Sequence, residues 1–275
     1  MNVFQAIVLG VLQGLTEFLP ISSTAHLRIV PALFGWDDPG AAFTAVIQLG
    51  TLLAVLIYFW RDLGGATAAW FRGFRGGPAS QTPECRLAWA AIIGTFPIAI
   101  LGLLFAEHIR GELRSLWVIS GALVLLALVL LAAERFASHR RDMSSVRAVD
   151  GLIVGLWQAL ALIPGVSRSG STITGALFLG FTRPAAARLS FLLSMPAIFL
   201  AGVHELIDQR AELLSAGLVP VGLATLAAFV SGYASIDFLM KFLRTHTTGV
   251  FIAYRVVLGL ALIGLILGGV LDPLR

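Results

Sequence analysis

A polar stretch at residues 164–172 stands between two apolar runs, residues 151–163 and 175–181. It contains four hydroxyl side chains, one arginine and two glycines. At bilayer depth each of these polar groups costs free energy unless a partner satisfies it. We interpret the stretch as a phosphate-binding turn, because the N–H groups and the positive end of a helix N-terminus bind anions.

Arg168 is the charged residue of this turn. Its guanidinium is permanently charged and presents planar donors that suit phosphate oxygens. An alternative is that Arg168 pairs with a buried carboxylate such as Glu17, and the two interpretations are compatible. The other predicted phosphate-binding residues of the turn are Ser167, Ser169, Gly170 and Thr172.

A second polar cluster surrounds a proline near the N-terminus. Gln13 and Glu17 are four residues apart, so they share one face of a helix. Beyond the proline, Ser22, Ser23 and His26 share a face at spacings of three and four. Ionisable residues inside membrane segments are expensive and indicate function, whereas single hydroxyls can equally cap a helix or bond to its carbonyls.

The composition is that of a polytopic membrane protein. Hydrophobic residues make up 58% of the chain and charged residues 12%, against about 25% charged in soluble domains, and the mean hydropathy is +0.91. A single cysteine excludes an intramolecular disulfide. The net charge of +4 is small and scattered, which favours an anionic substrate and orientation signals over nucleic acid as a partner.

The apolar pattern predicts an all-α fold with two similar halves in one integral membrane domain, residues 1–275. Residues 6–34 contain too many polar groups for one lipid-facing span, and we expect two short helices joined at Pro20 as a re-entrant hairpin. In the first half, residues 1–136, the predicted spans are 41–60, 87–106 and 116–133, and residues 61–86 are expected to form a mobile surface loop. The second half, residues 148–275, has a predicted hairpin at 151–181 and spans at 186–203, 218–240 and 250–270.

The two halves form an internal repeat. The segment before Gln13 aligns with the segment before Gln158, Gly10 falls on Gly155, and each segment leads to a proline and a serine-rich turn. Each half has one re-entrant hairpin and crosses the membrane three times. Because three is an odd number, the halves are predicted to have opposite orientations in the membrane. Inverted repeats of this kind place a binding site near the midplane, where broken helices meet.

The basic residues predict the orientation of the chain. The loops at 61–86, 134–148, 182–188 and 241–249 hold twelve arginines and lysines, and the opposite side holds four. The first set is expected to face the cytoplasm. Both termini and the first hairpin then face outward, and the second hairpin enters from inside.

With both motifs in view, the chain resembles the bacterial undecaprenyl-diphosphatases of the bacitracin-resistance family over its whole length. The motifs are Gln13-Gly-Leu-Thr-Glu17-Phe-Leu-Pro-Ile-Ser-Ser-Thr-Ala-His26 and Pro164-Gly-Val-Ser-Arg-Ser-Gly-Ser-Thr172. The resemblance implies an inner-membrane enzyme that hydrolyses undecaprenyl diphosphate to undecaprenyl phosphate and inorganic phosphate, which recycles the carrier lipid for cell-wall synthesis. It also implies a divalent cation, Mg or Ca. By motif position, the implied active residues are Glu17, Ser22, Ser23, His26, Ser167, Arg168, Ser169 and Thr172, and Ser22 is expected to bind the substrate phosphate.

The chemistry of the residues is compatible with this activity. Glu17, with Gln13 where some family members have glutamate, offers hard oxygen ligands for Mg or Ca. His26 can act as general base on a water or on Ser23, or can itself attack phosphorus. Arg255 is expected to face the bundle interior, either as a further phosphate ligand or as a partner of Asp150 or Asp237.

Two further expectations concern function class and partners. The alternative function is an inverted-repeat transporter or flippase for a phosphorylated lipid or anion. The expected partners are a polyprenyl diphosphate lipid and the membrane lipids, with a second copy of the chain as a candidate partner and no nucleic acid.

Overall fold

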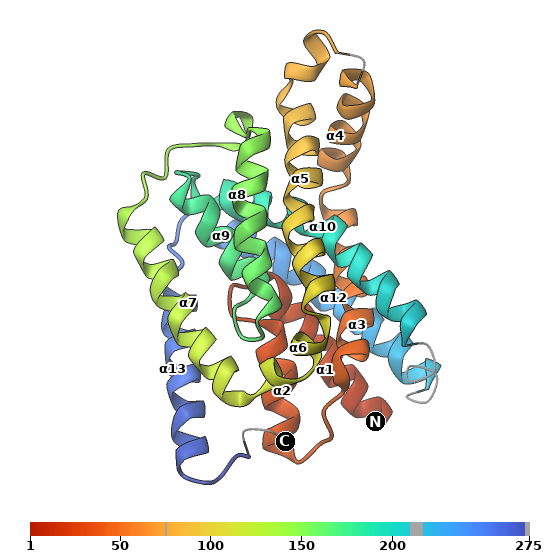
Figure 1. The fold of residues 1–275 in the computed structure, drawn as a ribbon, viewed down its shortest axis with the longest axis vertical. Coiled ribbons are helices and arrows are strands. Elements are labelled where there is room, and N and C mark those ends of the chain that lie inside the picture. The colour runs from red at the N-terminus through yellow and green to blue at the C-terminus, as the bar shows by residue number, and fades with distance from the viewer. Residues whose placement is uncertain (75, 210–216, 273–275) are drawn as a thin grey trace.

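The computed structural model describes residues 1–74, 76–209 and 217–272. The regular structure of this part is helical, apart from one isolated bridge between Arg141 and Phe181 (Figure 1). The first half comprises α1 (Val3–Phe18), α2 (Ser23–Phe34), α3 (Gly40–Tyr58), α4 (Trp60–Gly73), α5 (Pro83–Leu104), α6 (Ala106–Arg110) and α7 (Leu116–Phe136). The second half comprises α8 (Ala148–Ala159), α9 (Arg168–Phe178), α10 (Arg183–Asp208), α12 (Leu218–Phe242) and α13 (Gly249–Leu267).

Two hairpins of short helices form where the sequence predicts re-entrant segments. Pro20 follows α1 and prevents its continuation, and α2 begins after the N-cap Ser22. In the second half a short 3₁₀ turn, Leu160–Leu162, and Pro164 separate α8 from α9, whose N-cap is Ser167. Each hairpin therefore bends at a proline and restarts at a serine.

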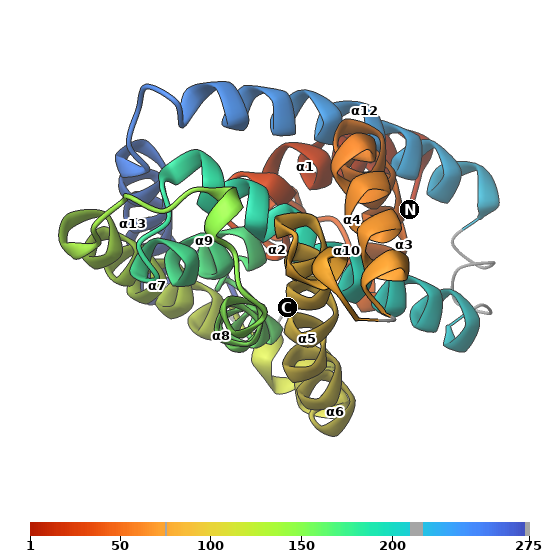
Figure 2. The ribbon, with the colours of Figure 1, turned by 90° about the horizontal axis from the view of Figure 1, so that it is seen from above.

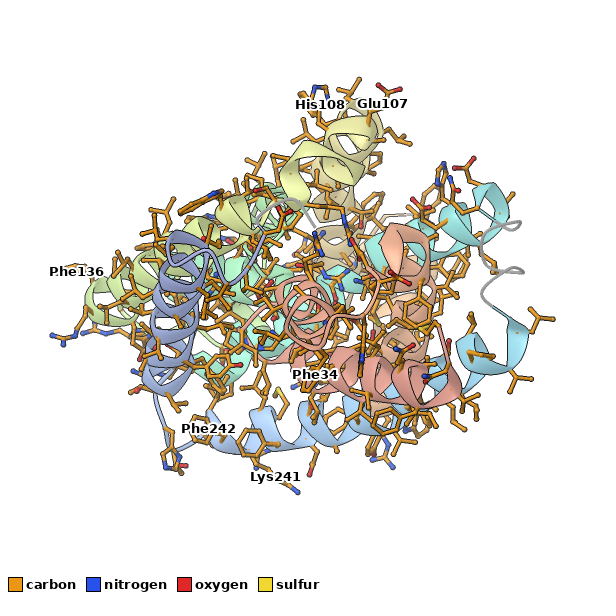
Figure 3. All side chains as sticks on the ribbon, turned by 90° about the horizontal axis from the view of Figure 1, so that it is seen from below. Phe34, Glu107, His108, Phe136, Lys241 and Phe242 are labelled. Carbon is orange, nitrogen blue, oxygen red and sulfur yellow. The ribbon has the colours of Figure 1, made fainter. Side chains whose placement is uncertain are left out.

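The predicted spans agree with the long helices. α5, α7, α10, α12 and α13 are long and apolar enough to cross a membrane, and α3 becomes a sixth such span if it is counted with α4, from which it bends by 78°. The chain is thus a multi-pass membrane protein. Phe136, at the end of α7, is 85% exposed and points outward at one edge of the molecule (Figure 3), as expected for apolar side chains that face lipid.

The prediction of a loop at residues 61–86 was wrong. Residues 60–73 form α4, which packs against α5, and residues 78–81 form a 3₁₀ turn. Ala66, Ala69 and Gly73 are buried at spacings of three and four, the pattern of a helix that packs through small side chains. Its glycines and arginines obscured this pattern in the sequence, and Arg75 of the predicted loop lies outside the described residues.

The helices of the two halves pack against each other in matching pairs. α1 lies along α12 and α8 lies along α5, α3 packs against α10, and α7 packs against α13 (Figures 1 and 2). Glycines permit the close contacts of the short helices. A Cβ atom on Gly10 would lie 2.2 Å from the carbonyl oxygen of Ala224, and one on Gly155 would lie 2.4 Å from that of Gly94.

The two ends of the molecule in Figure 1 are formed by different parts of the chain. Met1 and the end of α13 lie toward the same end of the molecule, and α4 projects from the other (Figure 1). Two other arginines used in the orientation prediction, Arg210 and Arg275, lie outside the described residues.

Candidate active site

The two hairpin turns meet inside the helix bundle. The hydroxyl of Ser169 donates to the carbonyl oxygen of Leu19 over 3.0 Å, and the backbone N–H of Gly165 donates to Thr24 Oγ1 over 3.4 Å. These bonds join turns that are more than a hundred residues apart in sequence. They bring both predicted polar clusters into one site.

Glu17 lies at the centre of this site, in the last turn of α1. Its Oε2 accepts hydrogen bonds from Gln13 Nε2 at 2.8 Å and from Ser23 Oγ at 2.6 Å. Its Oε1 accepts from the guanidinium of Arg168. A buried carboxylate is tolerated only when it is paired and hydrogen-bonded in this way.

Arg168 begins α9 and reaches across to the first hairpin. Its ion pair with Glu17 confirms the alternative interpretation, in which Arg168 pairs with a buried carboxylate. The side chain retains 15% exposure, against 4% for that of Glu17. Because a guanidinium has five N–H donors, the Glu17 contact leaves donors for a second anion.

His26 is held by two hydrogen bonds in the first turn of α2. Its Nδ1 lies 2.7 Å from the carbonyl oxygen of Ser22, and its Nε2 lies 2.6 Å from the hydroxyl of Tyr254. Since a carbonyl only accepts, Nδ1 carries the hydrogen and Nε2 accepts from Tyr254 in the neutral imidazole. The imidazole and phenol rings are nearly parallel, with centroids 5.6 Å apart.

Tyr254 is a site residue that the sequence analysis missed. It lies in the apolar span α13, beside the singled-out Arg255, and carries no charge that would mark it. Its proximity to His26 depends on a tertiary contact across 228 positions. The only signal in the sequence is a tyrosine next to a membrane arginine.

Ser22 and Ser167 occupy equivalent positions in the two turns. Both have a positive φ, 76° for Ser22 and 71° for Ser167, a conformation that costs free energy in residues other than glycine and occurs preferentially at functional sites. Ser22 Oγ accepts from the N–H of Ala25 at 3.3 Å, and Ser167 Oγ accepts from that of Gly170 at 3.1 Å. For these two serines, the expected alternative of helix capping is confirmed.

The remaining residues of the second turn lie at different depths. Ser169 Oγ lies within 3.2 Å of Ser167 Oγ, so both hydroxyls lie at the start of α9. Thr172 Oγ1 donates to the carbonyl oxygen of Arg168 at 2.7 Å and is 2.5 Å from the hydroxyl of Ser190 on α10, so it ties α9 to α10. A Cβ on Gly170 would lie 2.6 Å from Arg255 Nη1. The glycine therefore allows the guanidinium of Arg255 to approach α9.

Arg255 is fully buried and binds backbone carbonyls. It donates to Leu123, Ala122, Pro20, Gly165 and Val166 over 3.0–3.4 Å. Three of these carbonyls belong to the two hairpin turns, so Arg255 holds both turns from behind. The expected partners Asp150 and Asp237 pair instead with Arg141 and Lys241. Its predicted phosphate contact stays a prediction.

The oxygens that could hold a divalent cation are those around Glu17. Among the described residues, no group of three or more His, Cys, Asp or Glu side chains could hold a metal ion alone. Gln13 Oε1 is buried and without a hydrogen-bond partner in that part of the chain, and it adjoins the Glu17 carboxylate that Gln13 Nε2 contacts. Such oxygens suit Mg or Ca, which commonly take their other ligands from water or substrate phosphates.

Comparison with known proteins agrees with the two motifs. A family profile described as "Bacitracin resistance protein BacA" matches residues 6–261. The chain belongs to this family. A relative from Myxococcus xanthus (strain DK1622), named undecaprenyl-diphosphatase, is 56% identical over 278 residues, which cover 100% of this chain and 92% of the relative.

Other relatives of the family carry the same name. The undecaprenyl-diphosphatase of Chlorobium phaeobacteroides (strain BS1) is 53% identical, with 99% of this chain and 100% of the relative covered. That of Chlorobaculum tepidum (strain ATCC 49652 / DSM 12025 / NBRC 103806 / TLS) is 52% identical with the same coverage. The resemblance inferred from the two motifs is thereby confirmed.

Proposed function

We propose that the chain hydrolyses undecaprenyl diphosphate to undecaprenyl phosphate and inorganic phosphate. The name shared by relatives that match the whole chain supports this substrate. The observation that carries the proposal is the contact between Arg168 and Glu17, because it joins a guanidinium suited to phosphate to a carboxylate of the opposite hairpin that also accepts a hydrogen bond from Ser23.

Arg168 and the N-terminus of α9 bind the diphosphate. The substrate carries more negative charge than Glu17 and competes with this carboxylate for the guanidinium. Donors fixed in a site that excludes water stabilise the charge that develops during phosphoryl transfer. Ser167 and Ser169 add hydroxyl donors beside the same helix end.

His26 and Ser23 supply the proton chemistry. Ser23 Oγ donates to Glu17, which places a hydroxyl beside a carboxylate able to accept its proton. His26 Nε2 is a basic nitrogen that accepts a hydrogen bond from the hydroxyl of Tyr254. It becomes available to a water or another hydroxyl when Tyr254 releases this bond. Trapping a phospho-enzyme distinguishes attack by Ser23 or His26 from direct attack by water.

A divalent cation, Mg or Ca, completes the proposed site. Glu17 and Gln13 Oε1 would hold it together with oxygens of the diphosphate. When bound, the cation neutralises charge on the phosphoryl oxygens.

We also propose that the two halves are an inverted repeat. The packing pairs are those expected from a twofold relation: the first helix of each hairpin lies on the second span of the other half, and first and third spans pair with their counterparts. Inverted halves bring the hairpins from opposite membrane faces to the midplane. In the bacterial inner membrane, the basic loops then face the cytoplasm and both termini the periplasm. Two copies of the chain are proposed to associate, which a mass measurement in detergent tests.

Phosphate release from undecaprenyl diphosphate by the purified protein in detergent tests the function. We expect Glu17→Ala, His26→Ala and Arg168→Ala each to lose about 10²-fold or more of the rate. Matched controls are Glu84→Ala, His108→Ala and Arg72→Ala, which alter exposed residues of the same types and are expected to retain activity.

Two results would contradict the proposal. Full activity in the three site variants contradicts the site assignment. No release by the unmodified protein, with and without Mg or Ca, favours an inverted-repeat transporter or flippase that binds the headgroup without hydrolysing it.

A further inference from the structure

Arg255 is a buried charge to which the proposed reaction gives no role. The residue is 0% exposed. In the described part of the chain its hydrogen-bond acceptors are five backbone carbonyl oxygens, and none of them belongs to a carboxylate. A charged side chain inside a membrane helix is costly and indicates function. What Arg255 does must therefore follow from the carbonyls that it binds.

These carbonyls belong to three segments that meet at the candidate active site. Two of them lie on α7. The first turn contributes the carbonyl of Pro20, which accepts from Nη1 at 3.4 Å. The second turn contributes those of Gly165 and Val166, which accept from Nη2 at 3.2 and 3.0 Å. One guanidinium thus fixes the backbone of both turns relative to α7.

The carbonyl of Val166 also determines where a backbone donor points. The described chain contains no cis peptide bond. In a planar trans peptide, the C=O and the N–H point to opposite sides. The N–H that shares a peptide plane with the Val166 carbonyl is that of Ser167. Because this carbonyl points at Arg255, the N–H of Ser167 points away from it.

The N–H of Ser167 is a free donor. The other two turn carbonyls share their planes with the N–H groups of Ile21 and Val166, which donate within their own turns at 2.7 and 3.2 Å. Within the residues that the structure describes, the N–H of Ser167 has no such acceptor. Ser167 is only 6% exposed, and buried N–H groups are rarely left unpaired. This N–H is therefore available to a ligand.

The free donor lies where the diphosphate is proposed to bind. Ser167 is the N-cap of α9 and directly precedes Arg168, whose guanidinium contacts Glu17. Backbone N–H groups at a helix N-terminus bind phosphate. The φ of Ser167 is 71°, a conformation that persists only where the surrounding structure holds it. The contact of Arg255 with the preceding carbonyl supplies such a hold.

Gly170 makes room for this arrangement. A Cβ at this position would lie 2.6 Å from Arg255 Nη1, closer than a side-chain carbon can approach without displacing the guanidinium. The missing side chain of Gly170 therefore allows Arg255 to reach the second turn from beneath the first turn of α9.

We propose that Arg255 is a positioning residue, which holds the peptide between Val166 and Ser167 so that the N–H of Ser167 donates to a phosphoryl oxygen of the diphosphate. This inference rests on the proposed function. Arg255 acts through the backbone and touches no substrate atom, whereas Arg168 contacts the phosphate itself. A donor that is oriented before the substrate binds stabilises the charge that develops during phosphoryl transfer.

Phosphate release by Arg255→Lys, measured below the Tm of the variant, tests this role. Lysine keeps the charge, but a single ammonium lacks the planar fork that reaches all three segments. We expect kcat to fall at least about tenfold while KM stays within about threefold, because a misplaced donor weakens transition-state binding most. The matched control is Arg141→Lys, which alters another arginine that donates to backbone carbonyls and is expected to keep its kcat.

Gly170→Ala tests the same contact without changing the arginine. We expect the added Cβ to displace the guanidinium and to lower kcat in the same way. Gly264→Ala is the control, because a Cβ there meets nothing within 4 Å. In the double variant Arg255→Lys/Gly170→Ala, kcat is expected to fall no further than in the weaker single variant, because both changes break one contact. Losses that multiply would contradict this shared role.

The amide proton of Ser167 reports the donor directly. In protein labelled with [¹⁵N]serine and assigned with Ser167→Ala, we expect this proton to shift downfield on addition of methylenediphosphonate, a diphosphate analogue that is not hydrolysed. The shift is expected to be lost in Arg255→Lys. Because this titration needs no turnover, an Arg255-dependent shift in a protein that releases no phosphate would reject the proposed function alone.

Three results would overturn the positioning role. The first is an unchanged kcat in Arg255→Lys. The second is a rise in KM at constant kcat, which would make Arg255 a phosphate ligand. The third is an amide proton of Ser167 that does not shift when the unmodified protein is titrated with methylenediphosphonate.

Discussion

Arg168 contacts one anion, Glu17, and is proposed to bind another. Its pairing with Glu17 fixes the guanidinium at the N-terminus of α9, so a phosphate that binds there meets an oriented fork of donors. A lysine in this position would keep the charge and lose the planar geometry. The geometry of the donors, rather than the charge alone, is expected to determine the rate.

Arg168→Lys tests this expectation. We expect phosphate release to fall by at least about tenfold, because a single ammonium cannot make the two parallel bonds of a guanidinium. The measurement is kcat/KM for undecaprenyl diphosphate, with Arg72→Lys as the exposed control. Wild-type kcat/KM in Arg168→Lys would mean that charge alone is sufficient.

Tyr254→Phe tests the role of the His26 contact. The substitution keeps the ring that stacks on the imidazole and removes the hydroxyl that donates to Nε2. We expect kcat to fall about tenfold while KM changes little, because the imidazole loses its orientation and the phosphate-binding groups are unchanged. Tyr233→Phe, another partly exposed tyrosine, is the control. A rise in KM at constant kcat would instead make Tyr254 a substrate-binding residue.

The site residues divide into those that the sequence reveals and those that only the fold reveals. Glu17, His26 and Arg168 could be singled out as candidate site residues, because an ionisable side chain inside an apolar segment is costly and indicates function. Tyr254 was not, since an uncharged ring in α13 resembles any residue facing lipid. The positive φ of Ser22 and Ser167 was not predictable either, because residue type indicates a positive φ only where the residue is glycine.

The contact of α1 with α12 depends on glycine. A Cβ on Gly10 would meet the backbone of Ala224 at 2.2 Å, too close for any side chain without separation of the helices. We expect Gly10→Ala to destabilise the protein by about 1–3 kcal/mol and to lower its Tm in detergent. Gly121→Ala is the control, because a Cβ on Gly121 meets nothing within 4 Å, and it is expected to leave the Tm unchanged or to raise it. An equal fall in both variants would show that the close packing at Gly10 is not the cause.

The connection between α2 and α3 is held by Asp38. Arg114 Nη2 donates to both of its carboxylate oxygens, at 2.7 and 2.8 Å, and Arg28 lies 3.6 Å away. Burial acts to raise the pKa of Asp38, but Arg114, the backbone N–H of Gly40 and Arg28 together outweigh burial and hold this pKa below its ordinary value. The carboxylate therefore stabilises the fold at pH values above its unfolded pKa of about 4, and this contribution is lost as the pH falls through the lower folded pKa.

Asp38→Asn tests this linkage. At pH 7 we expect the variant to have a lower Tm than the unmodified protein, and the difference to shrink as the pH is lowered below about 4, where the unmodified carboxylate also loses its charge. Thermal denaturation in detergent over a pH series is the measurement. A difference that is the same at every pH would show that Asp38 acts through shape rather than charge.

At the scale of elements, the sequence predicted the long helices better than the short one. The five long helices and the two pairs of short helices lie where length and apolar composition predict them, because the bilayer thickness constrains both strongly. α4 was missed because its buried face consists of Ala66, Ala69 and Gly73, small residues with a weak hydrophobic signal. What stabilises α4 is its tertiary packing on α5, and single-chain periodicity does not report packing partners.

The whole molecule has two ends, and the proposed orientation assigns each to one side of the membrane. α2 connects to α3, and α5 to α7, toward the end where Met1 lies, whereas the linker 137–147 and the α12–α13 connection lie toward the other. Cys85 is fully buried, so the unmodified chain serves as an unlabelled background. Single exposed cysteines can then report the side directly.

A membrane-impermeant maleimide applied to spheroplasts measures this orientation. We expect Asp37→Cys and His108→Cys to be labelled, since both positions are exposed at the end predicted to be periplasmic. Arg140→Cys and Thr245→Cys, exposed at the basic end, are expected to react only after the membrane is opened, because positively charged loops remain in the cytoplasm. Labelling of Arg140→Cys and Thr245→Cys, but not of the first pair, in closed spheroplasts would show that the chain has the opposite orientation. Equal labelling of all four would contradict a single topology, and with it the assignment of the first hairpin to the periplasmic face and of the second to the cytoplasmic face.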